Sequence, residues 1–156
     1  MRAAFFDVGD TLVQAWKEPA LLAPFQRRRL VAALGERDWY DAFLASPHDG
    51  DDEDGVAQAT LDRIRDWLRA SGVPVEELDL DRIRDALVLP LDEVGRLTPG
   101  AADALRWCHA AGLRVVLVTN TLWRGDDDVR SDWDRFGLGA CIDGVASSHS
   151  VGWRKP

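Results

Sequence analysis

The sequence predicts an α/β protein in which a parallel sheet is interrupted by a long helical insert after its first strand. Two observations favour this fold class. Short apolar runs typical of strands lie near both ends of the chain, at residues 3–7, 113–118 and 141–145. Between the first two runs, residues 14–96 carry helical patterns and no convincing strand. We therefore expect residues 1–13 and 97–156 to form an α/β core, and residues 14–96 to form a separate helical domain.

The first strand, residues 3–7, is rich in aromatic residues and stops at a turn sequence, Asp7-Val8-Gly9-Asp10. In the insert, apolar spacing and stop residues predict helices at 25–34, 38–45 and 56–70. Pro24 is expected in the first turn of the first of these helices. The segments 61–68 and 80–87 share the pattern Leu-Asp-Arg-Ile-Arg-Asp-X-Leu. This repeat predicts two amphipathic helices that bury the same kind of face in one bundle.

After the insert, the pattern returns to alternating helix and strand. Residues 101–111 and 126–136 predict helices, and the aspartates at 126, 127 and 128 are expected to lie at the positive end of the second one. Between them, residues 113–118 form a β-branched run typical of a parallel strand that is buried on both faces. Trp67 and Trp133 fall on apolar helix faces and are expected in the core.

Charge and composition exclude several classes of partner. The chain has 27 acidic and 19 basic residues, a net charge of −8, which argues against nucleic-acid binding through a basic surface. Five of the acids lie within residues 49–54, which we interpret as a solvated turn between helices. No apolar run approaches the roughly 18 residues that span a membrane, and an acid at position 7 argues against a signal peptide. With two cysteines only, we expect a cytoplasmic protein.

Polar residues follow each predicted strand at its carboxyl end, where parallel sheets bind their ligands. Asp7 ends the first strand, Thr119 and Asn120 follow the second, and the segment after the third leads to Lys155. A carboxylate, neutral donors and an ammonium group together suit a phosphate ligand. Taken singly, each residue has an ordinary alternative, because a strand-end Asp often caps a turn and a Lys near a terminus is usually solvated.

Three motifs in this order resemble those of the haloacid dehalogenase-like (HAD) hydrolase superfamily. Phe5-Phe6-Asp7-Val8-Gly9-Asp10-Thr11-Leu12 is similar to its first motif, and Leu117-Val118-Thr119-Asn120 to its second. Ser148, followed by Val151-Gly152-Trp153-Arg154-Lys155-Pro156, resembles the approach to its third. The resemblance covers nearly the whole chain, and it implies a Rossmann-like parallel sheet with a helical cap at residues 14–96.

The resemblance also implies a role for each residue. Asp7 would attack phosphorus and form an aspartyl-phosphate, and its carboxylate would bind Mg²⁺ together with the backbone carbonyl of Gly9. Thr119 and Asn120 would hold phosphate oxygens, and Lys155 would steady the negative charge. The helical cap would close over a small phosphorylated substrate and exclude water. The function this implies is that of a Mg²⁺-dependent phosphatase.

The sequence departs from the family pattern in two places. The family's general acid, two residues after the nucleophile, is replaced by Gly9, and an aspartate occurs one position later as Asp10. The acidic pair of the fourth motif, which would complete the Mg²⁺ site, is not found after Lys155. We therefore expect a C-terminally incomplete chain in which the outer edge of the first strand has no neighbour.

Two other functions remain open at this point. A non-catalytic HAD-like fragment could serve as a binding module, because the fourth motif is missing. A phosphorelay receiver domain also combines strand-end acids, a Thr and a Lys-Pro pair, but it has no room for a helical insert of this length. Near the candidate site, Trp123 either lines the substrate pocket or packs beneath the cap, and Arg124 is a candidate second contact for an anion.

Overall fold

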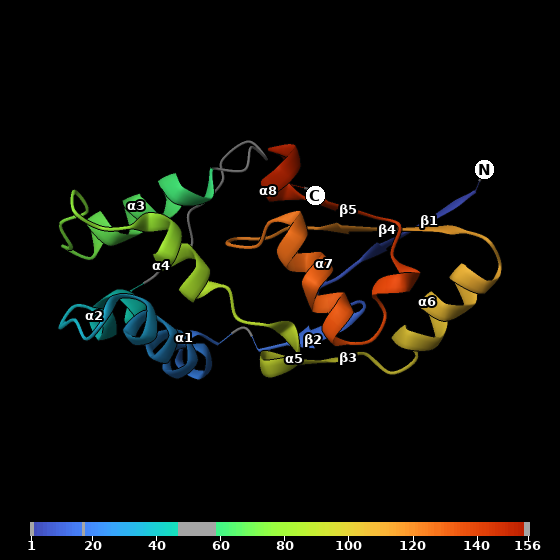
Figure 1. Ribbon diagram of the computed structural model, residues 1–156, viewed down its shortest axis with the longest axis horizontal. Helices are drawn as coiled ribbons and strands as arrows, with labels where there is room; N and C mark the ends of the chain where they lie inside the picture. Colours follow the sequence, from blue (N-terminus) through green and yellow to red (C-terminus); the bar gives the residue numbers. More distant parts are fainter. Residues whose placement is uncertain (1, 17, 47–58, 155–156) are drawn as a thin grey trace.

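The computed structural model describes residues 2–16, 18–46 and 59–154. A three-stranded parallel sheet has the order β1-β4-β5, formed by Ala3–Asp7, Arg114–Thr119 and Gly144–Ser147. Figure 1 shows this sheet at one end of the molecule and the helices α1–α4 gathered at the other. The predicted α/β fold class is confirmed. The acidic segment 49–54 and Lys155 lie outside the described residues.

Helices account for most of the remaining described chain. Four longer ones lie within residues 14–96: α1 (Pro19–Leu34), α2 (Tyr40–Ala45), α3 (Thr60–Ala70) and α4 (Leu80–Leu87), and the short α5 named next lies there too. The others are the short α5 (Leu91–Val94), α6 (Ala101–Ala110), α7 (Asp126–Arg135) and the short α8 (Ser148–Val151), with a 3₁₀ turn at Gly139–Cys141. The two copies of the sequence repeat form α3 and α4, as predicted.

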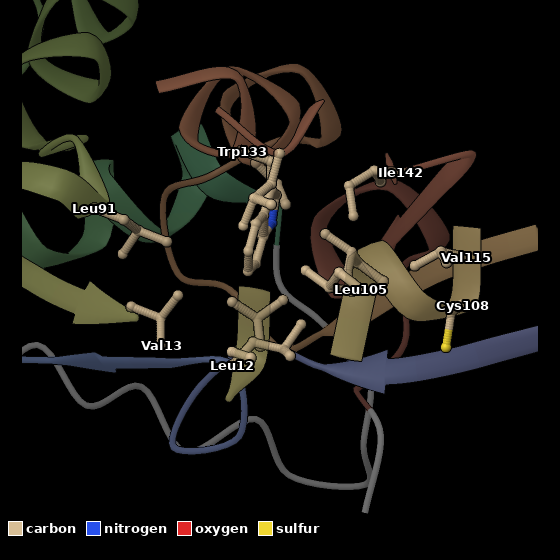
Figure 2. Packing of buried hydrophobic residues seen from close by; sticks show 13 residues of the cluster. Leu12, Val13, Leu91, Leu105, Cys108, Val115, Trp133 and Ile142 are labelled. Atoms are coloured by element: carbon tan, nitrogen blue, oxygen red, sulfur yellow. The ribbon is translucent and has the colours of Figure 1, made fainter. Parts of the chain in front are cut away.

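The buried apolar residues form two separate clusters. The first joins the sheet to α6 and α7, and its largest fully buried side chain is Trp133. Figure 2 shows the Trp133 ring pointing from α7 toward Leu12 and Leu105. The second cluster lies among α1–α4, where Phe43 and Trp67 have ring centroids 3.9 Å apart. Burial of such aromatic rings contributes strongly to both clusters, since each removes a large apolar area from water.

Among the described residues, helices α6 and α7 pack against one face of the sheet. Ala4, Phe6 and Leu117 belong to the first cluster, together with residues of α6 and α7. Because side chains alternate along a strand, Phe5 lies on the opposite face, and 69% of it is exposed. Parallel sheets are normally covered on both faces. β1 is also the edge strand, with no strand beside its outer side in the described part of the chain.

An open, apolar edge strand predicts self-association. We expect Phe5→Lys to weaken concentration-dependent association, because it places a charge at the centre of β1. Trp107→Lys is the matched control, since Trp107 is 67% exposed but belongs to helix α6 and not to the edge strand. Sedimentation velocity over a range of concentrations would measure the difference. Equal association of the two variants would show that the edge is not responsible.

The structure corrects the predicted start of the first helix. α1 begins at Pro19, so Pro24 lies inside the helix and not in its first turn. The first turn is closed by the amides of Leu21 and Leu22, which donate to the carbonyl of Glu18 at 3.0 and 3.3 Å. Proline removes one backbone donor from a helix interior. Packing of α1 against α2 and α4 compensates for this loss, and no local sequence signal reports such packing.

The sequence predicts a wholly helical insert between the first two sheet strands, and the structure corrects this at the ends of the insert. Its two ends pair as an antiparallel ladder of β2 (Val13–Ala15) and β3 (Gly95–Leu97). Within the described part of residues 20–90 no strand is present. Three-residue strands are too short to show alternation, and these partners lie far apart in sequence, so the pattern could not predict them.

The third sheet strand begins later than predicted. The expected strand at 141–145 is replaced by a 3₁₀ turn and by β5, Gly144–Ser147. Asp143 fixes this register, because its amide donates to the Val115 carbonyl at 2.8 Å and its carboxylate accepts the Val115 amide at 2.8 Å. The large apolar residue Ile142 packs into the first cluster instead. Small residues then form the strand itself.

Candidate functional site

Asp7 is the last residue of β1 and lies at the carboxyl end of the sheet. Its carboxylate accepts a hydrogen bond from the amide of Val8 at 2.8 Å and another from the hydroxyl of Thr11 at 3.0 Å. The following loop is held in place by the amides of Leu12 and Val13, which both donate to the Val8 carbonyl at 2.9 Å. These bonds place the Asp7 carboxylate at the start of a tight, ordered turn.

Asp10 lies within this turn with a φ of 58°, the left-handed region that non-glycine residues rarely adopt. Its amide donates to the Val13 carbonyl at 2.9 Å. Aspartate tolerates this conformation better than most residues, which explains its occurrence at this position. The aspartate at position 10 thus occupies the left-handed residue of this loop.

Thr119 ends β4, the strand beside β1. The Cα atoms of Asp7 and Val118 are register partners, and Thr119 pairs with Ser147 of β5. The predicted site residues Asp7 and Thr119 are thus brought to neighbouring strand ends. Strand alternation directs the two side chains to opposite faces, so a shared ligand would lie beyond the strand ends, where both faces meet. Asn120 comes directly after Thr119 in the same loop.

The loop after β4 is fastened to the segment after β5. The amide of Thr121 donates to the Ser148 hydroxyl at 3.0 Å, and that hydroxyl donates to the Thr121 carbonyl at 3.3 Å. Asp126 at the start of α7 accepts three hydrogen bonds, from the Ser147 amide, the Ser147 hydroxyl and the Ser150 hydroxyl. The sequence singled out Ser148 but missed the role of Asp126, which was expected only to cap its helix. These bonds position the strand ends that carry the candidate site.

Arg124 closes a buried polar network. Its guanidinium donates to the carboxylate of Asp132 and to the carbonyl of Leu89. Asp132 is fully buried and also accepts the Leu91 amide at 2.9 Å. Burial lowers the pKa of Arg124, and the attraction of Asp132 opposes this shift. Burial raises the pKa of Asp132, while Arg124, the Leu91 amide and Arg135 oppose that shift.

Trp123 packs beneath the insert and does not line a pocket at the strand ends. It is 8% exposed, and its ring stacks on Trp67 at 5.5 Å with an angle of 11° between the planes. Arg84 of α4 donates from its Nε to the Trp123 carbonyl at 2.9 Å and also pairs with Asp128 of α7. Of the two alternatives for Trp123, packing is the correct one. The same contacts join the insert to the core.

The described residues supply only part of a magnesium site. The Asp7 carboxylate and the Gly9 carbonyl are oxygen ligands of the kind Mg²⁺ prefers. However, within residues 2–16, 18–46 and 59–154, no group of three His, Cys, Asp or Glu side chains could hold a metal ion. Both oxygens of Asp7 also accept hydrogen bonds in the turn. These residues alone therefore do not fit a tightly held cation.

No protein-family model matches the sequence, and the comparison with curated proteins also gives no match. Solved structures do match. CbbY from Rhodobacter sphaeroides in complex with phosphate has a TM-score of 0.58 and 23% identity, over 99% of this chain and 67% of its own. A second CbbY structure, a mutant, contains xylulose-(1,5)bisphosphate.

Two further structures agree. A predicted phosphoglycolate phosphatase from Haemophilus somnus 129pt has a TM-score of 0.54 and 18% identity, over 99% of this chain and 66% of its own. The putative HAD-hydrolase YfnB from Bacillus subtilis, bound to magnesium, has a TM-score of 0.53 and 18% identity, over 99% and 67%. This chain has the HAD-like fold. The motif resemblance found in the sequence is confirmed at the level of the fold.

The matches cover 99% of this chain, which spans only about two thirds of the length of each matched structure. Sequence identities of 18% to 24% between this chain and the matched structures show a shared fold, but they do not show that this chain has the activity of those proteins. No helix of the described residues is both long and apolar enough to span a membrane.

Proposed function

We propose that this chain belongs to a phosphatase that hydrolyses a small phosphorylated metabolite through an aspartyl-phosphate. The observation that carries the proposal is the placement of Asp7 and Thr119 at the carboxyl ends of neighbouring parallel strands. This is where α/β sheets bind ligands. The structure of CbbY, which is 23% identical to this chain and has the same fold, contains phosphate. That likeness supports a phosphorylated substrate.

In the proposed reaction, an Asp7 oxygen forms a bond to phosphorus while the bond from phosphorus to the leaving alkoxide breaks. The alkoxide takes up a proton, and water then attacks the phosphorus of the acyl-phosphate. This second step releases phosphate and regenerates the carboxylate. Thr119 and Asn120 are proposed to hold the phosphate oxygens, and Lys155 to offset their charge. Gly9 supplies no general acid, so Asp10 is the proposed proton donor.

The helical insert, residues 14–96, is the proposed cap, and residues 1–13 and 97–156 are the proposed core. Support comes from the two separate apolar clusters and from the β2–β3 ladder at the junction. A cap of this kind would exclude water from the strand ends. The two reduced cysteines, Cys108 and Cys141, agree with a proposed cytoplasmic location.

Mg²⁺ is the proposed cofactor, with Asp7 and Gly9 as ligands, and it would supply positive charge beside the phosphate. Because the described residues offer no group of three His, Cys, Asp or Glu side chains that could hold a metal, we propose that this chain holds the ion weakly. The alternative function is a non-catalytic binding module. It keeps the strand-end site and the insert but forms no covalent intermediate.

The phosphoenzyme distinguishes these two functions. The chain would be mixed with a generic phosphomonoester and Mg²⁺, quenched in acid, and weighed by intact-protein mass spectrometry. The proposal expects a fraction carrying one phosphoryl group, located on Asp7 by peptide mapping and removed at alkaline pH, where acyl-phosphates hydrolyse. Binding of the ester without any phosphoryl transfer would favour the binding module.

A further inference from the structure

A cavity of about 280 Å³ lies at the junction of the insert and the core. It is lined by residues of α1, α4 and α7 and of the loops before α5 and α7, and Asp7 and Thr119 are not among them. Four arginines and three aspartates line it: Arg29, Arg84, Arg124, Arg135, Asp85, Asp128 and Asp132. In a chain with net charge −8, a cavity with more cations than anions is a local exception.

The carboxylates of this cavity are already occupied. Asp128 accepts hydrogen bonds from Arg84 and from the amide of Gly125. Asp132 accepts from Arg124, Arg135 and the Leu91 amide. Asp85 accepts from Arg84 at 2.9 Å. Arg84 and Arg124 therefore satisfy most of the carboxylate acceptors of the cavity. The remaining two arginines, Arg29 and Arg135, must find acceptors for their N–H groups elsewhere.

The donors of the cavity are in excess. Arg29 of α1 donates only to backbone carbonyls, those of Ala86 at 3.2 Å and Asp85 at 3.0 Å, and pairs with no carboxylate in the described part of the chain. Arg135 of α7 makes one bond, to Asp132 at 3.3 Å, and is 44% exposed. Each guanidinium carries five N–H donors, so most of those on these two arginines have no protein acceptor among the described residues.

We infer that this cavity binds a small oxyanion, with Arg29 and Arg135 as its principal contacts. Two guanidinium groups from different helices match the several acceptor oxygens of a phosphate group. The bound anion would balance the surplus positive charge and connect α1 of the insert to α7 of the core. The site is separate from the strand-end site and does not depend on its proposed activity.

Titration calorimetry with inorganic phosphate tests this site, using Asp7→Asn throughout so that no turnover occurs. Ionic strength is held constant with chloride. We expect saturable binding that is weakened at least about tenfold by Arg29→Ala, the loss expected for a charge-assisted hydrogen bond. Arg29→Lys should recover part of the affinity because it keeps the charge. Arg28→Ala, one position away on α1, is the matched control, since Arg28 is exposed and contacts Phe25.

A second arm distinguishes free phosphate from a phosphate ester. If glycerol phosphate binds with similar affinity and the same dependence on Arg29, the site recognises the phosphate group of an ester as well. Phosphate should also raise the thermal midpoint of the Asp7→Asn chain, because it binds only the folded state, and it should raise that of the same chain with Arg29→Ala by less. Equal affinity of the Arg28 and Arg29 variants, or no saturable binding by the folded parent chain, would overturn the inference.

Discussion

Replacing Asp7 with asparagine is expected to reduce hydrolysis of a phosphomonoester by roughly 10³-fold or more, the scale seen when a covalent nucleophile is removed. The amide keeps the size of the side chain but cannot form the proposed acyl-phosphate. The bond from the Val8 amide can still be accepted by the amide oxygen, so the turn should survive. Initial rates with a chromogenic phosphate ester measure the change, and circular dichroism checks the fold.

Asp10→Asn is the informative companion to this variant. Asparagine tolerates the left-handed backbone at this position, so the turn should be preserved. If Asp10 donates the proton to the leaving group, its loss should cost about 10²-fold or more with a poor leaving group and far less with an activated one. Full activity in Asp7→Asn would refute the proposed nucleophile, whatever Asp10 does.

Removing the carboxylate of Asp132 is expected to destabilise the fold by about 3–5 kcal/mol, the range for breaking a buried ion pair. Asp132→Ala would leave Arg124 buried without its counter-charge and the Leu91 amide without its acceptor. The raised pKa of Asp132 does not contradict this expectation. It reports the desolvation cost of the charge, whereas the variant leaves the partner cation uncompensated.

The matched control is Asp134→Ala, which removes an exposed carboxylate from the same helix and should change stability by about 0.5 kcal/mol or less. Urea unfolding followed by tryptophan fluorescence measures both variants. A double variant with Arg124→Met should recover part of the loss, because it removes the unpaired charge. Equal stability of the Asp132 and Asp134 variants would show that the network contributes little.

Sequence patterns were sufficient to predict an element where the apolar residues of the segment itself determine whether it forms a helix or a strand. The β-branched run forms β4, because a short continuous apolar run is typical of a buried strand. The repeated Leu-Asp-Arg-Ile pattern forms α3 and α4, because its apolar residues recur at helical spacing. Patterns failed where distant contacts decide the outcome. Pro24 is accommodated inside α1 by packing, and the hydrogen bonds of Asp143 shift β5 toward smaller residues.

The candidate site shows the same division. The positions of Asp7 and Thr119 follow from strand ends, which the sequence marks clearly. The supporting contacts of Asp126 with Ser147 and Ser150 cross between two loops, and no spacing in the sequence relates them. Arg124 likewise looked like a free cation beside the site, because its acceptors, Asp132 and the Leu89 carbonyl, become visible only after folding.

The β2–β3 ladder has a consequence for how this protein could change over evolutionary time or in the laboratory. Because Ala15 and Gly95 are register partners, the chain leaves the core and returns to it at neighbouring positions. A short hairpin turn could in principle close this gap, as could an unrelated domain whose ends lie close together. We therefore expect that residues 14–96 can be replaced by a different insert without a change in the order of the three sheet strands.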